Sequence, residues 1–148
     1  SGTMTVSGDP VLLLSFISFA NSGTITKNGG AGNWALQIDR VSNHTNTGRY
    51  EAQTGTITFQ SLGNFGGHVS SGAANFFHAA AGAQITFLPV NGETYQFVGT
   101  QFTGPGLKSL AGGGTAASYT FGGTINASNT TLPKVSVRLG NRNKSAEA

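Results

Sequence analysis

Short runs rich in β-branched and aromatic residues recur along this chain, and glycine-rich turns separate them. The runs alternate apolar and polar residues and are bounded by Gly, Asn and Pro, a pattern that is typical of all-β proteins. At most one short segment has the composition of a helix. We therefore predict an antiparallel sandwich (jelly-roll-like) or a barrel of about seven to nine short strands.

The domain organisation is predicted to be simple. We find no repeat of fixed period and no linker, so residues 11–139 are interpreted as a single β domain. Residues 1–10 form an N-terminal segment, and its first three residues, Ser-Gly-Thr, are typical of a cloning remnant. Residues 140–148 form a polar, basic tail.

The clearest local prediction is a β-hairpin over Ala83–Phe102, because Asn-Gly is the strongest short hairpin signal. A two-residue loop would scatter the large apolar side chains over both faces. A three-residue loop, with Gly92 in the left-handed conformation, gathers them on one face, and we predict this register. The side chains concerned are Ile85, Phe87, Tyr95 and Phe97. Glu93 then lies at the hairpin tip.

The most apolar run is Val11–Ala20, VLLLSFISFA. It is too short for a membrane helix, which needs about 20 residues, and no basic residue precedes it as in a signal peptide. We interpret it as a strand that is buried on both faces, and we predict no transmembrane segment. Gly63–Gly82 leaves two alternatives open: a short helix capped by Ser71 and ended by Gly82, or a loop followed by a strand.

Composition limits the class of protein. Only 9% of the residues are charged, so Asn, Gln, Ser, Thr and Gly must cover the surface. The chain has no cysteine, which excludes disulfides but leaves the compartment open. The net charge of +3 is small and dispersed, so no specific nucleic-acid binding is expected.

No set of residues has the spacing of a catalytic or metal site. Asp39 and Glu51 flank one turn and are the one carboxylate pair considered for glycoside hydrolysis. We favour a solvent-facing position for both, where they balance Arg40 and Arg49. His44, His68 and His78 lack zinc-ligand spacing, and no G-x-S-x-G motif is present. We predict no enzyme activity, no catalytic residue, no metal and no cofactor.

Two groups of residues are candidates for binding. A sugar-stacking platform is one hypothesis for the aromatic residues, with core packing as the favoured alternative because each lies in or beside the apolar phase of a strand. These residues are Trp34, Tyr50, Tyr95 and Tyr119. The C-terminal region contributes basic residues for contacts with an anionic partner, or else a solvated end. These are Lys134, Arg138, Arg142 and Lys144.

One local phrase has a likeness outside this chain. Thr47–Phe59, TGRYEAQTGTITF, is similar to the hairpin phrase of exported bacterial barrels related to allene oxide cyclase, in which a G-R-Y run precedes a G-T-hydrophobic strand. The likeness covers thirteen residues, and Glu51 and Gln53 replace the small residues that are usual there. It implies a hairpin at this place and assigns no family to the chain.

The function predicted from these observations is that of a non-enzymatic structural or adhesive subunit of a virion, phage tail or cell-surface assembly. The partner expected is a second copy of the chain, with the N-terminal strand at the contact and the basic tail beside it. The alternative is an extracellular carbohydrate-binding module. Either function places the protein outside the cell, on a cell surface or on a virion.

Overall fold

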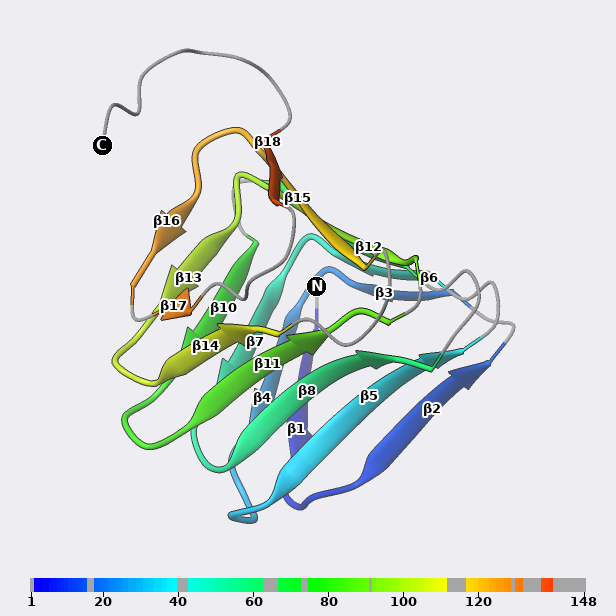
Figure 1. Ribbon diagram of the computed structural model, residues 1–148. Coiled ribbons are helices and arrows are strands. Elements are labelled where there is room, and N and C mark those ends of the chain that lie inside the picture. Colours follow the sequence, from blue (N-terminus) through cyan, green and yellow to red (C-terminus); the bar gives the residue numbers. More distant parts are fainter. Residues whose placement is uncertain are drawn as a thin grey trace.

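The computed structural model describes residues 2–15, 18–39, 43–62, 67–72, 75–90, 92–111, 117–128, 130–131 and 137–139. In this part of the chain there are eighteen β-strands and no helix. The strands form three six-stranded sheets, and every strand pair is parallel. The chain is therefore a parallel β-solenoid: each coil adds one strand to each sheet before the next coil begins (Figure 1).

Sheet A consists of β1 (Thr3–Val6), β4 (Thr24–Lys27), β7 (Arg49–Ala52), β10 (Phe76–Ala79), β13 (Gln101–Thr103) and β16 (Asn126–Ala127). Sheet B consists of β2 (Val11–Ser15), β5 (Asn33–Asp39), β8 (Thr56–Ser61), β11 (Gln84–Leu88), β14 (Leu107–Leu110) and β17 (Thr130–Thr131). Sheet C consists of β3 (Phe19–Asn21), β6 (Asn43–Asn46), β9 (Gly67–Ser71), β12 (Thr94–Val98), β15 (Ser118–Gly122) and β18 (Val137–Leu139).

The prediction of an antiparallel sandwich or barrel of seven to nine strands is wrong, although the chain is all-β. Alternation of apolar and polar residues identifies a strand but not the direction or position of its partner. Each strand here pairs with one from the next coil instead of with its neighbour in sequence. In sheet A, Thr24, Arg49, Phe76 and Gln101 are stacked at intervals of 25, 27 and 25 residues. This uneven interval is the repeat that a search for a fixed period does not find.

The predicted hairpin over Ala83–Phe102 is a corner of the solenoid, because β11 belongs to sheet B and β12 to sheet C. The four large side chains do share one environment, since all are buried in the common interior. Gly92 has a φ of +82°, which confirms the left-handed conformation. Glu93 is only 4% exposed, so it does not lie at an exposed tip, and its Oε2 accepts a hydrogen bond from the Val90 N–H at 3.2 Å.

The Val11–Ala20 prediction also needs correction. Its described residues belong to two strands, β2 and β3, in different sheets. β2 is the outermost strand of sheet B, at the lower right of Figure 1, and its outer face is exposed rather than buried. In the Gly63–Gly82 segment the described residues form β9, β10 and a turn at 81–82, which matches the loop-plus-strand alternative.

The phrase Thr47–Phe59 forms no hairpin either. Its two strands, β7 and β8, lie in sheets A and B and are separated by a corner. The same rule therefore holds at both places: a turn between consecutive strands changes sheet instead of reversing direction.

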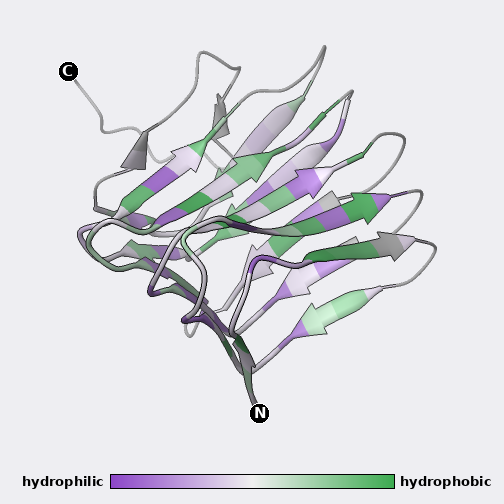
Figure 2. Cartoon of the chain, turned by 90° about the horizontal axis from the view of Figure 1, so that it is seen from below, coloured by the Kyte–Doolittle hydropathy of each residue, from purple (hydrophilic) through white to green (hydrophobic). Residues whose placement is uncertain are grey.

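The three sheets enclose one interior that is filled by rows of stacked rings. Alternate residues of each strand point inward, as the alternating hydropathy along the strands in Figure 2 indicates. Phe59 and Phe87, one coil apart in sheet B, stack with ring centroids 5.0 Å apart. In sheet A, the Phe77 ring stacks between Tyr50 and Phe102, each at 5.7 Å. Because coils repeat at the strand spacing of about 4.8 Å, identical inward positions place rings in contact.

A row of polar side chains fills the corner between sheets C and A. Asn21 Nδ2 donates to Asn46 Oδ1 at 2.9 Å, and Asn46 Nδ2 donates to Asn75 Oδ1 at 3.3 Å. Asn75 Nδ2 in turn donates to Thr100 Oγ1 at 2.7 Å. All four side chains are buried, and each amide finds its partner on the next coil, which offsets the cost of removing it from water.

Candidate assembly edge and binding face

Three strands form the edge at one end of the solenoid: β1, β2 and β3 are the outermost strands of sheets A, B and C on the same side. We call these three strands the N-terminal edge. An outermost strand has a row of backbone N–H and C=O groups with no partner in its own sheet. Such a row can pair with another strand.

The hydrogen bonds of β2 show which of its backbone groups face outward. The Ala35 N–H donates to the Pro10 carbonyl at 3.1 Å, while Ala35 is paired in register with Val11. In such a parallel ladder, the residues on either side of Val11 bond to Ala35, and Val11 turns its own N–H and C=O away from β5. The direction alternates along a strand. The backbone groups of Val11, Leu13 and Ser15 therefore point to the free edge.

Three large apolar side chains of the N-terminal edge are exposed. Met4 is 40% exposed, Val11 61% and Leu13 52%. Residues 10–26, which include all of β2 and β3, contain no Asp, Glu, Lys or Arg. Proteins usually protect an edge strand with lysine, proline or an inward-pointing charge. Here Pro10, at the entrance to β2, is the one such residue beside that strand.

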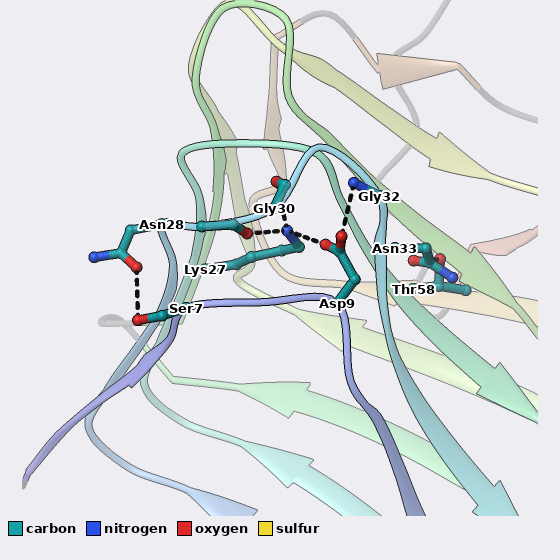
Figure 3. Close-up of polar contacts among 9 residues, drawn as sticks. Ser7, Asp9, Lys27, Asn28, Gly30, Gly32, Asn33 and Thr58 are labelled. Atoms are coloured by element: carbon teal, nitrogen blue, oxygen red, sulfur yellow. Dashed lines mark hydrogen bonds and ion pairs between the residues drawn. The ribbon is translucent and has the colours of Figure 1, made fainter.

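The charged residues at the entrance to β2 and at the end of β4, Asp9 and Lys27, pair with each other. Lys27 Nζ lies 2.8 Å from Asp9 Oδ1 and donates to the carbonyl oxygens of Gly29 at 2.5 Å and Gly30 at 3.0 Å (Figure 3). Asp9 also accepts a hydrogen bond from the Gly32 N–H at 3.1 Å. The hydrogen bond from Lys27 holds the pKa of Asp9 below its usual value. This ion pair fixes the corner between sheets A and B, so it does not protect the edge of β2.

The outward face of sheet A carries a cluster of charged, aromatic and imidazole side chains. Arg49 pairs with Glu51 in the same strand, and the Arg49 guanidinium lies 5.5 Å from the centre of the Phe76 ring on the next coil. In the same strand as Phe76, His78 Nδ1 lies 3.0 Å from Thr103 Oγ1 of the following coil. An open groove of about 340 Å³ runs beside this cluster. It is lined by Gly2, Thr3, Ser22, Gly23, Thr24, Gly48, Arg49 and Phe76.

The other two histidines lie inside the solenoid. His44 Nδ1 and His68 Nδ1 are 2.5 Å apart, so one of the two nitrogens carries a proton and donates a hydrogen bond to the other. The outer nitrogens lie 2.7 Å from the Tyr50 hydroxyl and 2.8 Å from Ser70 Oγ. Burial lowers the pKa of His44 to about 3. Burial, and secondarily the neighbouring His44, lowers the pKa of His68 well below its usual value.

The four aromatic residues considered for a sugar platform lie inside the solenoid. Trp34, Tyr50, Tyr95 and Tyr119 are at most 2% exposed. The hydroxyl groups of the three tyrosines have interior partners; the Tyr119 hydroxyl, for example, lies 2.8 Å from the Phe87 carbonyl oxygen and 2.6 Å from that of Ala111. A stacking platform needs exposed rings, and the core-packing alternative agrees with this burial. Phe76 is an aromatic residue that lines the groove on the outward face of sheet A, and it lies in the segment Gly63–Gly82 for which the sequence left two alternatives open.

The remaining predicted site residues are separated from each other. Asp39 is in β5 of sheet B, and Glu51 is in β7 of sheet A, so the structure does not bring these carboxylates together on one face. Lys134, Arg142 and Lys144 lie outside the described residues. For Arg138 the described feature is its backbone position in β18, where it pairs with Thr120. β18 is at the opposite end of sheet C from β3, so the last described residues are not beside the N-terminal edge.

Searches for metal sites, membrane spans and similar proteins give no assignment. Among the described residues, no three His, Asp or Glu side chains are grouped so that they could hold a metal ion. Within the same ranges, no helix has the length and hydrophobicity to span a membrane. Comparison of the chain with protein-family models, curated proteins and solved structures finds no match.

Proposed function

We propose that this chain is a non-enzymatic structural subunit of an extracellular or virion-surface assembly, and that it self-associates through its N-terminal edge. The observation that supports this proposal is the exposed, uncharged strand β2. Its free backbone groups and exposed Val11 and Leu13 together offer both components of strand pairing, hydrogen bonds and apolar contact. The low charge of the whole chain, 9% of residues, provides little repulsion between copies.

The first experiment measures the molar mass of the protein in solution, for the wild type and for a variant with a lysine on β2. We expect size-exclusion chromatography with light scattering to show an oligomer for the wild type at micromolar concentration. Ser15→Lys places a lysine on the free edge and should weaken association by about tenfold or more, equivalent to about 1.4 kcal/mol. Folding should change little, because Ser15 lies at the end of β2 on the outward face of sheet B, beside Asp39 of β5.

The matched control is Gln96→Lys. Gln96 is half-buried on the outward face of β12, in the middle of sheet C. The substitution therefore adds the same positive charge away from the N-terminal edge. It should leave the association unchanged. A wild type that stays monomeric at high micromolar concentration would contradict the proposal, as would a Ser15→Lys variant that unfolds without any effect on association.

A carbohydrate-binding module is the second candidate, and the groove on sheet A is the observation in its favour. Phe76 and Arg49 at this groove supply apolar and charged contacts, and Thr3 and Thr24 supply hydroxyl groups. Titration with neutral and with acidic polysaccharides, followed by calorimetry, tests this function. Phe76→Ala should abolish binding while Gln96→Ala leaves it intact. Equal binding by both variants would exclude the groove.

A further inference from the structure

The partner of β2 can be derived from the geometry of its free edge. We infer that it is a second copy of this chain, bound with β2 antiparallel to the partner's β2 about a two-fold axis at Leu13. The inference rests on the proposed self-association and adds the orientation and register of the contact. A two-fold contact closes with two copies, whereas a head-to-tail contact continues into a filament.

The backbone groups at the edge determine the register. Val11, Leu13 and Ser15 direct their N–H and C=O groups away from β5, because Ala35 bonds to the Pro10 carbonyl in a register that pairs it with Val11. Antiparallel strands exchange two hydrogen bonds at every second pair of residues. An axis at Leu13 makes all three of these residues hydrogen-bonded, with Leu13 opposite the partner's Leu13 and Val11 opposite the partner's Ser15. An axis at Leu12 would pair only the free backbone groups of Val11 and Leu13 with those of the copy and would leave Ser15 beyond the end of the partner's β2.

The side chains fit the same register. Val11 and Leu13 are exposed on the outer face of sheet B, and the two-fold axis brings the two Leu13 side chains together at the centre of a joined sheet. Val11 then lies beside the partner's Ser15. β2 contains no charged residue, so the contact with its own copy opposes no like charges. The exposed apolar area on each copy becomes continuous across the joint.

The opposite end of sheet B is a poorer match for β2. Its outermost described strand is β17, which pairs with β14 through two residues, Thr130 and Thr131. β2 has five residues and pairs with β5 along its full length. A head-to-tail contact with the described part of β17 would therefore leave most of the free groups of β2 without a partner, whereas a second β2 matches them in number.

A single introduced cysteine tests the two-fold axis, since the chain has none of its own. Two residues in a hydrogen-bonded antiparallel pair have Cα atoms about 5.5 Å apart, which is within the range of a disulfide. Leu13→Cys should therefore form a disulfide-linked dimer on mild oxidation, seen on a non-reducing gel. Val11→Cys alone should not, because the two copies of residue 11 are then about 13 Å apart along the strands. The double variant Val11→Cys/Ser15→Cys should cross-link again.

The outcomes separate this inference from the proposed function. A cross-linked Leu13→Cys dimer, a wild-type mass of two chains and no cross-link for the surface control Gln96→Cys support the two-fold contact. A wild type that associates while Leu13→Cys does not cross-link overturns the two-fold contact and leaves the proposed self-association standing. A mass that grows continuously with concentration likewise overturns it in favour of a filament. A monomeric wild type overturns both.

Discussion

Mild acid should destabilise this protein at a pH where its carboxylates are still ionised, because of the buried pair His44 and His68. Both side chains are fully buried, and their rings lie 4.6 Å apart. The described residues that contact the two rings supply aromatic groups and hydroxyls, but no carboxylate. They are Phe19, Tyr50, Phe59, Ser70, Phe77, Phe87, Tyr95 and Phe97. A proton added to the pair therefore finds no opposite charge nearby.

The size of the effect follows from the pKa of each histidine in the two states. Burial lowers the pKa of His44 from 6.5 to about 3 in the folded protein. The unfolded chain therefore binds a proton below pH 6.5 that the folded protein does not, and stability falls as the pH falls from 6.5 towards 3. At pH 5 the loss is about 2 kcal/mol for His44. His68, whose pKa burial also lowers, adds to this loss in the same direction. The loss from His44 alone is a substantial part of the roughly 5–15 kcal/mol that stabilises a typical domain.

Urea unfolding at pH 7.5 and pH 5.0, at one protein concentration, measures this loss. The double variant His44→Gln/His68→Gln should remove most of the pH dependence, since glutamine hydrogen-bonds but does not titrate in this range. His78→Gln is the control and should retain it, because His78 lies half-buried on the outward face of sheet A and bonds to Thr103. In the folded wild type, NMR signals of two histidines should not titrate above pH 5. An equal free energy of unfolding at the two pH values would refute the reasoning, whatever the variants do.

Two further predictions concern single residues. Gly92→Val should destabilise the protein by about 1–2 kcal/mol, because Gly92 has a φ of +82° that a β-branched residue adopts only with strain. A Cβ at this position would meet nothing within 4 Å, so backbone strain is the only expected cost. An unchanged melting midpoint would mean that the turn can change its conformation. Lys108→Met should lower the free energy of unfolding in urea by about 3 kcal/mol. Lys108 is buried, and its Nζ donates to the carbonyl oxygens of Thr103, Gly104 and Gly106 at 3.0, 2.6 and 2.8 Å. A variant as stable as the wild type would show that water replaces the ammonium group.

The strands with clear apolar–polar alternation could be predicted from the sequence, but their partners could not. Alternation in Trp34–Val41 places Trp34, Leu36 and Ile38 on one face, and all three are buried in the interior from β5. The partner of β5 is β8, with Trp34 beside Ile57, and no local pattern marks two residues 23 positions apart as neighbours. Asn-Gly at a corner of a solenoid has the same local chemistry as at a hairpin, which is why residues 83–102 were assigned a reversal of direction that they do not make.

The candidate edge was hidden for a related reason. An apolar run such as Val11–Ala20 normally indicates a strand covered on both faces. Val11 and Leu13 are exposed because their coil is the first in the stack. The position of a coil in the stack is a property of the whole fold and not of the local sequence. The buried histidines were missed because NHTN, the sequence of β6, has the composition of a polar turn. Inside the solenoid each of His44 and Asn46 finds its hydrogen-bond partner on an adjacent coil, so polar residues can occupy inward positions.

The strand order of the three sheets also determines how the molecule should respond to a mechanical load. In the described part of the chain every strand pair joins adjacent coils, so no pairing ties the first coil to the last. A force applied along the stack at the two ends is then carried by each coil-to-coil contact in turn. The contact with the fewest rings and hydrogen bonds fails first, and each failure releases about 25 residues, or about 85 Å of extended chain. A single molecule pulled from its two ends would therefore lengthen in small steps instead of unfolding at once.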